Sequence, residues 1–530
     1  YCGDGLSRSR RTVLVLRGCG CGSTTISARA RRIAISSGPV VPDRFAPVLR
    51  ELAPLTERFR AAGHRLYLVG GTVRDLLVDS GRADFDLDLT TDARPDQIKA
   101  CLDGWADAVW NQGEKFGTIG AHKLNAETGE QRPYEITTFR AEAYTDLSRK
   151  PHVVFADEIE TDLSRRDFTV NAMALELTGD SASGGGAPVL VDPFDGAVDL
   201  ATRTLRTPMG PDISFSDDPL RMLRAARFIA RYQLQPSDEL VAAVKAMADR
   251  LEIVSAERIR DELDKLMVVD HPSPGLWFLI QTGLADQFFP ELPAMRLEHD
   301  PIHRHKDVLT HSLAVVENVR PLNENPAIVS GERPEFDFRL TRLAALFHDI
   351  GKPRTRGYLE GKGTTFHHHD AVGARMTKKR LSALRYSNDD VAAVTELVAL
   401  HLRFHTYSMG WSDSAVRRYV RDAGPLLQEL NVLTRCDCTT RNAKKAARLS
   451  LRMDELEARI DELAAQEELA ALRPEMDGNE VITHLGITPG RDVGEAMKFL
   501  MEVRLEDGLI GDRAVRARLD AWWRERHADS

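Results

Sequence analysis

Cysteine is scarce in this sequence of 530 residues: the chain has six, and no two are spaced as Cys-x-x-Cys. So few cysteines give no disulfide framework in a chain of this size, which favours a reducing, cytoplasmic compartment. Apolar runs of about 18 residues are also absent, so we expect no membrane span. Positive charge is not in excess, because 71 lysines and arginines face 80 acidic residues. The net charge of −9 disfavours nucleic-acid binding through bulk charge, but it leaves room for a local basic groove.

The remaining composition is that of an ordinary globular protein. Apolar residues make up 42% and charged residues 28%, which excludes global disorder, and the length suffices for three or four domains. The first 38 residues differ, because they hold seven arginines and one acidic residue among many serines and glycines. This composition resembles an organellar presequence, and a misplaced start or a disordered extension fits it as well. We expect residues 1–40 to be an unstructured or spurious extension.

Two carboxylates stand at the end of the segment LVGGTVRDLLVDSGRADFDLD, residues 68–88. Asp86 and Asp88 are two residues apart, so in an extended segment both side chains point to the same side. A pair of divalent cations relieves their repulsion and suits phosphoryl or nucleotidyl transfer. Asp84 completes an alternating triplet and is the reserve candidate for the pair.

Glycines and an arginine precede this pair. Gly70 and Gly71 let the backbone approach a triphosphate closely, and Arg74 supplies fixed positive charge. We therefore predict a nucleotidyltransferase head with magnesium at Asp86 and Asp88. A solvated acidic loop is the alternative explanation of the aspartates.

The order of these residues, followed by Thr90, Thr91 and Pro95, resembles the opening motif of one family. This is the family of class II tRNA nucleotidyltransferases and bacterial poly(A) polymerases. Glu135 opens the segment EITTFRAEAY and is expected on a strand that faces the dyad. It is either a third catalytic acid or an ordinary strand-edge glutamate.

Two arginines follow in DLSRRDFTVNAMA, residues 162–174. This segment resembles the Arg-Arg-Asp motif of the family, in which an arginine reaches the nucleotide and the aspartate orients it. The resemblance assigns that role to Arg166 first and to Arg165 second. A guanidinium matches phosphate oxygens in a bidentate way, which suits triphosphate binding. A surface pair of arginines is the alternative.

The segment DDPLRMLRAARF, residues 217–228, carries charged residues at three-residue spacing between apolar ones. On a helix they form one slowly drifting stripe. A salt-bridged surface helix is the alternative. In the resembled family this helix reads CTP and ATP without a template, which makes Asp218 and Arg221 the base readers. The family's usual glutamate is Asp217 here. The predicted nucleotide-binding residues of the stripe are Asp218, Arg221, Arg224 and Arg227.

Histidines and aspartates in the second half suggest a metal centre, because helical metal hydrolases assemble such sites from successive helices. The segment HDIGKP, residues 348–353, resembles the signature of HD-domain phosphohydrolases. We expect a divalent transition metal or magnesium here. The ligands of one metal are predicted to be His311, His348, Asp349 and Asp437, and a second position is completed by His369 and His401. The resemblance permits phosphohydrolase activity without establishing it or specifying a substrate.

The predicted fold class is α+β. A head with a mixed β-sheet and helices should be followed by three helical parts. In the body, SAERIRDELDKLM opens with a serine-glutamate capping pattern. In the tail, a long charged helix should pack on its own domain or form a short coiled coil. The predicted divisions are the head at 41–205, the neck and body at 206–300, the HD domain at 301–443 and the tail at 444–530.

Together these motifs predict a tRNA nucleotidyltransferase. The resemblance implies that it adds C, C and A to the 3′ end of tRNA from CTP and ATP, without a template, and releases pyrophosphate. A poly(A) polymerase is the nearest alternative. An HD hydrolase with a degenerate head and an RNA-binding protein with vestigial sites are the others. The oligomeric state stays open.

Overall fold

A computed structural model describes most of the chain. The described ranges are 43–78, 87–125, 129–143, 152–178, 188–297, 307–320, 335–360, 363–406, 411–439, 442–466 and 472–527. The predictions for residues 1–40, Asp84 and Asp86 lie outside these ranges. No helix within them combines the length and the apolar composition needed to cross a membrane.

A seven-stranded mixed sheet forms the head, in the order β3-β4-β5-β2-β1-β8-β9. Neighbouring strands are antiparallel except β2 and β5, which run parallel. The apolar run that predicted the first strand is buried at all four positions. The strands are β1 (Leu66–Val69), β2 (Leu87–Thr91), β3 (Ala108–Trp110), β4 (Thr118–Leu124), β5 (Gln131–Thr138), β8 (Ala174–Glu176) and β9 (Val189–Val191).

Short helices and small strand pairs complete the head and its junction with the body. The helices are α1 (Ala46–Ala61), α2 (Gly71–Val78), α3 (Pro95–Leu102), α4 (Ile159–Ser164) and α5 (Gly196–Thr202). The paired strands are β6 (Arg140–Ala143) with β7 (His152–Phe155) and β10 (Thr204–Leu205) with β11 (Gln235–Pro236).

Helices dominate the rest of the chain, and one strand pair accompanies them. The body holds α6 (Pro211–Asp217), α7 (Leu220–Tyr232), α8 (Asp238–Met247), α9 (Ala256–Met267), α10 (Ser273–Gln281), α11 (Leu284–Phe288) and α12 (Glu291–Ala294). The next part holds α13 (Val308–Asn318), α14 (Phe338–Phe347), α15 (Lys352–Thr355), β12 (Arg356–Leu359), β13 (Gly363–Phe366), α16 (His369–Ala383), α17 (Asn388–Leu400), α18 (Asp413–Ala423) and α19 (Leu427–Cys436). The last helices are α20 (Ala443–Gln466), α21 (Gly478–Leu485), α22 (Arg491–Asp507) and α23 (Asp512–Arg526).

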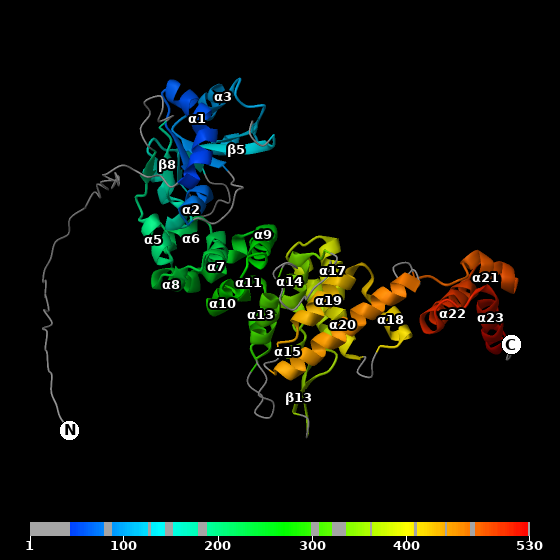
Figure 1. The fold of residues 1–530 in the computed structure, drawn as a ribbon. Coiled ribbons are helices and arrows are strands. Elements are labelled where there is room, and N and C mark those ends of the chain that lie inside the picture. The colour runs from blue at the N-terminus through cyan, green and yellow to red at the C-terminus, as the bar shows by residue number, and fades with distance from the viewer. Residues whose placement is uncertain are drawn as a thin grey trace, which may run out of the picture.

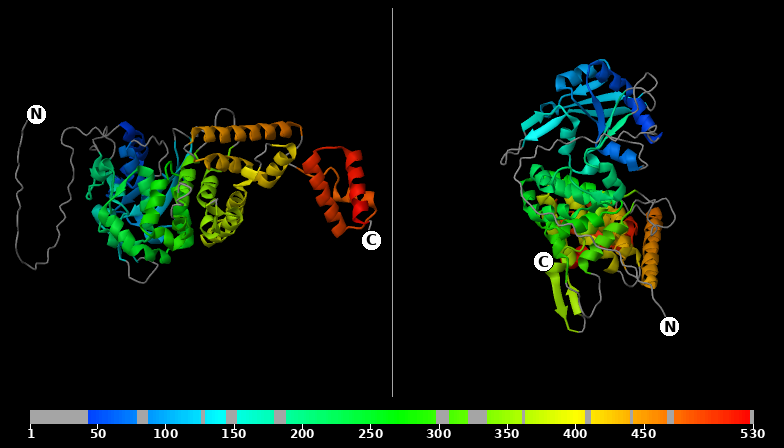
Figure 2. Two further views of the ribbon diagram at one scale, coloured as in Figure 1. Left: turned by 90° about the horizontal axis from the view of Figure 1, so that it is seen from below. Right: turned by 90° about the vertical axis from the view of Figure 1, so that its left-hand side faces the viewer.

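The parts follow one another in space as they do in sequence. Figures 1 and 2 show the head and the last three helices at opposite ends, with the helical parts between them. The predicted α+β head followed by helical parts is confirmed.

The predicted tail contributes to two separate cores. Apolar residues of α20, such as Leu456 and Leu463, join the large core shared with the preceding helices. Helix α20 packs on α18 and α19, so Leu456 and Leu463 are covered within the chain without a coiled-coil partner, whereas Leu451 is exposed. Helices α21 to α23 enclose a small core of their own, with Val481, Leu500 and Leu519.

Two helix starts differ in detail from the sequence expectation. The Ser255 hydroxyl caps α9 as predicted, by accepting a hydrogen bond from the backbone N–H of Arg258. The third helical position, where a capping box needs glutamate or glutamine, is Arg258 itself. Asp218 was expected on the base-reading helix, but it precedes α7 in an extended conformation.

A buried arginine joins the body to the HD helices. Arg342 of α14 is fully buried. Its guanidinium donates hydrogen bonds to the carbonyls of Val319 (2.9 Å), Met267 (2.7 Å), Asp270 (3.1 Å) and Val269. Burial lowers its pKa to about 10, so it stays charged at neutral pH. The last carbonyls of a helix have no hydrogen-bond donor within the helix. Arg342 supplies this donor at the ends of α9 and α13.

We predict that Arg342→Met lowers the free energy of unfolding by about 3–4 kcal/mol, because buried carbonyls lose their donor. Arg339→Met is the matched control on the same helix. Arg339 pairs with Asp264 and Asp390 and is 28% exposed, so its loss should cost about 1 kcal/mol. Urea titration followed by circular dichroism measures both. Equal losses in the two variants would contradict the role assigned to Arg342.

Candidate active site and metal centre

A polar cavity of about 370 Å³ opens between the sheet of the head and the first body helices. Acidic and basic side chains line it in equal number. The acids are Asp88, Glu135, Asp162, Asp167 and Asp218, and the bases are Arg140, Arg165, Arg166, Arg221 and Arg224. The volume lies in the range of small-ligand sites, and the charges suit a ligand that carries both metal ions and phosphates.

Two carboxylates of the cavity come from adjacent strands. Asp88 on β2 and Glu135 on β5 are direct partners in the parallel register. Side chains at paired positions of neighbouring strands share one face, and both carboxylates line the cavity. Oxygen ligands of this kind suit hard divalent cations. The structure therefore places Glu135 beside Asp88, the residue of the predicted pair that lies within the described ranges.

Gly70 stands beside this carboxylate. Its φ of +73° lies in the left-handed region, which favours glycine. A Cβ at this position would lie 3.3 Å from Arg166 Nη1 and 3.5 Å from Asp88 Oδ2. A side chain here would therefore crowd the acid and the arginine, which explains the first glycine of the motif. At Gly71 a Cβ would lie 3.3 Å from Arg74 Nη2.

Arg74, predicted to contact the triphosphate, does not line the cavity. Its side chain is buried, pairs with Asp75 at 2.8 Å and hydrogen bonds to Asn171. The guanidinium also lies over Tyr232 of α7, 4.2 Å from the ring centroid. These contacts hold α2 against the body, and they direct the charge of Arg74 inward.

The arginines of the Arg-Arg-Asp motif do line the cavity. Arg166 pairs with Asp162 at 3.2 Å, and Arg224 of α7 pairs with Asp167 at 2.6 Å. Burial opposes ionisation of Asp167, but the Arg224 guanidinium and the Asn171 amide hold its pKa below the usual value. The buried Nε atoms of Arg166 and Arg224 find no acceptor among the described residues. The cavity lining, and not these covered atoms, supplies the guanidinium groups that match phosphate oxygens.

The two predicted base readers both lie at the cavity. Arg221 donates to the Ser214 hydroxyl (2.9 Å) and to the carbonyl of Arg165 (2.6 Å). Asp218 accepts hydrogen bonds from the backbone N–H of Leu220 (3.1 Å) and from Arg258 (2.8 Å). Both side chains are therefore oriented before any base arrives.

The last residue of the stripe, Arg227, is placed elsewhere. It lies outside the cavity lining and pairs with the buried Glu262 of α9 at 2.8 Å. The stripe drifts around the helix, so its far end meets α9 and its near end meets the cavity. The nucleotide contact of Arg227 stays a prediction.

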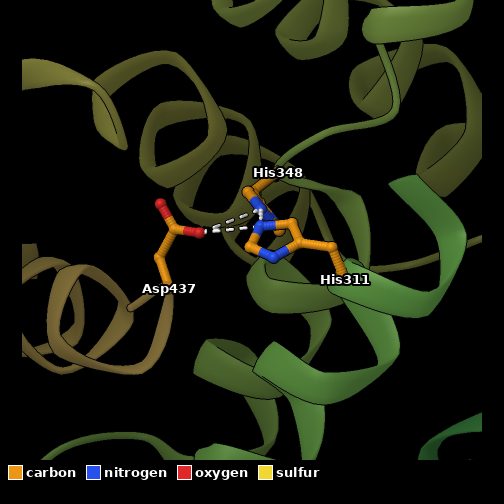
Figure 3. Close-up of side chains that lie close together, drawn as sticks. All are labelled: His311, His348 and Asp437. Carbon is orange, nitrogen blue, oxygen red and sulfur yellow. Dashed lines mark hydrogen bonds and ion pairs between the residues drawn. The ribbon is translucent and has the colours of Figure 1, made fainter. Parts of the chain in front are cut away.

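The six predicted ligands of the second half come together as two groups. His311, His348 and Asp437 form one group, shown in Figure 3, and the other consists of Asp349, His369 and His401. Within each group the ligand atoms lie within 4.8 Å of one another. Five of the six residues lie at helix ends. His348, His401 and Asp437 directly follow α14, α17 and α19, Asp349 comes next after His348, and His369 is the first residue of α16.

This placement fixes the orientation of three imidazoles. The Nδ1 atoms of His348, His369 and His401 each lie 2.7–2.8 Å from the carbonyl three residues earlier. A carbonyl only accepts, so Nδ1 carries the proton and Nε2 keeps a lone pair for a metal. The Nδ1 atom of His311 instead contacts the Thr439 hydroxyl at 2.8 Å.

Asp349 lies between the two groups. Its Oδ2 is 3.3 Å from His348 Nε2, and its Oδ1 is 3.4 Å from His369 Nε2. Burial opposes its ionisation, but His348 and Lys352 hold its pKa well below the usual value. Burial also lowers the pKa of His401 to about 4, so that this imidazole is neutral at physiological pH. An ionised carboxylate with imidazole nitrogens close to both of its oxygens suits two divalent ions.

Gly351 explains the glycine of the HDIGKP segment. A Cβ there would lie 2.2 Å from the His369 carbonyl oxygen and 2.7 Å from the Gly373 nitrogen. Backbone cannot yield that far, so only glycine lets the turn after His348 pack against α16. The two ligand groups depend on this close approach.

Several residues at these sites were missed from the sequence. Arg140 and Asp162 line the head cavity, and Lys352 Nζ lies 2.6 Å from Asp349 Oδ2. All three lie within the motifs EITTFRAEAY, DLSRRDFTVNAMA and HDIGKP. Membership in a motif could therefore have identified them as site residues. The Thr439 contact to His311 spans 128 residues and left no local signal.

Comparisons with known proteins match three parts of this chain. The Poly A polymerase head domain matches residues 66–206, the probable RNA and SrmB-binding site of polymerase A matches 233–295, and the HD domain matches 308–442. The A-adding tRNA nucleotidyltransferase of Deinococcus radiodurans is 33% identical over 466 residues, which cover 86% of this chain and 95% of that protein. This chain belongs to the tRNA nucleotidyltransferase family.

Other relatives in the family align over less of their length. The CCA-adding enzymes of Lactobacillus helveticus and Lactococcus lactis are 35% and 37% identical, over 46% and 48% of this chain. The chain spans little more than half of each, 56% and 58%. The CCA-adding enzyme of Bacillus stearothermophilus, solved with CTP, shares the fold with a TM-score of 0.62 and 22% identity, over 92% of this chain and all of that one.

The HD centre gives a direct test of the bridging carboxylate. We predict that the wild-type centre holds two transition-metal ions, that His369→Ala keeps one and that Asp349→Asn loses both, because Asp349 serves both groups. Manganese bound after dialysis, measured by mass spectrometry, gives the stoichiometry. His367→Ala removes a neighbouring exposed histidine and should keep both ions. A full complement in well-folded Asp349→Asn would rule out the bridge.

Proposed function

We propose that this chain adds C, C and A to the 3′ end of tRNA from CTP and ATP and releases pyrophosphate. The observation that carries the proposal is the meeting, in one cavity, of the paired carboxylates Asp88 and Glu135 with the arginines and with Asp218. Metal-binding acids and phosphate-binding arginines together suit transfer of a nucleotide from a triphosphate.

Each group has a part in the reaction. Asp88, together with Asp86, would hold two magnesium ions, which activate the 3′-hydroxyl for attack on the α-phosphate and stabilise the departing pyrophosphate. Arg166 and Arg224 bind the triphosphate through donors that are already oriented by Asp162 and Asp167. Asp218 and Arg221 select the base through its hydrogen-bonding edge.

A second candidate function is addition of the terminal A alone. It is favoured by one observation, since the relative that aligns over 95% of its own length is an A-adding enzyme. The cavity chemistry is compatible with both, because cytosine and adenine each present an exocyclic amino group.

For the second half we propose hydrolysis of a phosphate ester by a pair of magnesium or transition-metal ions. The two ligand groups on either side of Asp349 support this. We also propose the domain divisions given above, with the body and the last three helices binding the tRNA, and a cytoplasmic location.

The purified protein should first be incubated with magnesium and a tRNA that lacks its last three nucleotides. CTP alone, ATP alone or both are supplied, and product lengths are resolved on a gel. Extension that stops after CCA supports the proposal. A second tRNA that already ends in CC is tested in the same way. If only this tRNA is extended, and by a single A, the protein is an A-adding enzyme. Long A tails would indicate a poly(A) polymerase.

We predict that Asp88→Ala lowers nucleotide addition by about 10³-fold or more, because the metal ions lose a ligand at the reacting phosphate. The double variant His348→Ala, Asp349→Ala should keep addition near the wild-type rate, since the HD centre is a separate site. Retained addition in Asp88→Ala would refute the role of this carboxylate. Loss of addition in a well-folded HD variant would indicate that the two sites are coupled.

A further inference from the structure

Two ion pairs join helix α9 to the base-reading helix α7 and to Asp218, which stands two residues before α7. Arg258 lies 2.8 Å from Asp218, and Glu262, one turn further along α9, lies 2.8 Å from Arg227. Residues four apart share one face of a helix, so α9 presents a cation and an anion to the complementary charges of the stripe. Of these four groups, only Asp218 lines the cavity.

The carboxylate of Asp218 needs an external partner to be oriented. The residue stands in an extended conformation between α6 and α7, with φ −145° and ψ 101°, so no helix turn confines its side chain. The Leu220 N–H binds Oδ1, and Arg258 Nη2 binds Oδ2. Arg221 is held differently, by the Ser214 hydroxyl and the Arg165 carbonyl. Arg258 is therefore the charged contact that orients one base reader without involving the other.

This contact matters for selection because of what a carboxylate can bind. An ionised carboxylate only accepts hydrogen bonds, and each oxygen has two lone pairs. Leu220 and Arg258 each use one lone pair on one carboxylate oxygen of Asp218. The second lone pair of each oxygen remains for a donor in the cavity. Cytosine and adenine offer an exocyclic amino group, whereas uracil and guanine offer a carbonyl at the same place. A fixed, ionised Asp218 thus accepts the first pair and repels the second.

We propose that Arg258 is a positioning residue for nucleotide selection, which acts by holding Asp218 in the orientation that accepts an amino group. This inference rests on the proposed function and extends it to a residue outside the cavity. The side chain of Arg258 is 51% exposed, so its contribution is that of a partly screened pair. The selectivity between amino and carbonyl bases should therefore fall by about fivefold without it.

The test compares kcat/KM for CTP and UTP on a tRNA that lacks its last three nucleotides. Arg258→Ala should lower the CTP-to-UTP ratio about fivefold, and Arg258→Lys, which keeps the charge, should restore part of it. General effects on triphosphate binding cancel in this ratio. Arg260→Ala is the matched control, since Arg260 lies on the same helix but donates to the carbonyl of Arg385.

A double-mutant cycle separates positioning from packing. In an Asp218→Asn background, Arg258→Ala should leave the ratio unchanged, because the group that Arg258 orients is already altered. An unchanged CTP-to-UTP ratio in Arg258→Ala would overturn the inference. The proposed function would still hold if the wild-type protein adds nucleotides. Absence of addition by well-folded wild-type protein would overturn the proposed function and the inference with it.

Discussion

Compensation of closely placed charges is the constraint on which both sites depend. In the head, carboxylates converge from β2 and β5, and arginines from α7 and the turn after α4 surround them. In the second half, four imidazoles surround Asp349 and Asp437. Buried like charges are costly unless paired or bound to metal. Asp162, Asp167 and Asp218 each pair with an arginine, and Asp349 and Asp437 lie beside imidazoles.

The two sites orient their groups by different means. In the head, side-chain pairs such as Arg224–Asp167 and Arg258–Asp218 hold the functional groups across helices. In the HD centre, the carbonyls near helix ends bind the imidazole Nδ1 atoms. Helix ends leave carbonyls without internal partners, so this arrangement uses acceptors that the fold supplies anyway. Arg342 connects the body and the HD helices, because its guanidinium donates hydrogen bonds to carbonyls at the ends of two helices.

The sequence predicted the larger features well because they depend on local patterns. Apolar runs identified the strands, helical spacing identified α7, and the order of motifs identified the family. The details failed where a contact depends on distant residues. Asp218 lies before its helix, and the partner that orients it is 40 residues away. Arg74 contacts Asn171, 97 residues away, and lies outside the cavity lining, which its motif position does not indicate, and its phosphate contact stays a prediction.

The sequence by itself determined the family, the α+β class and the residue types of both sites, since these follow from spacing along the chain. Tertiary structure alone decided which of these residues share a cavity. It placed Glu135 opposite Asp88 through strand register, and it placed Asp349 between two ligand groups through the packing of Gly351 on α16. The physical reason is that strand pairing and helix packing are long-range contacts, whose geometry depends on the whole core and not on the motif.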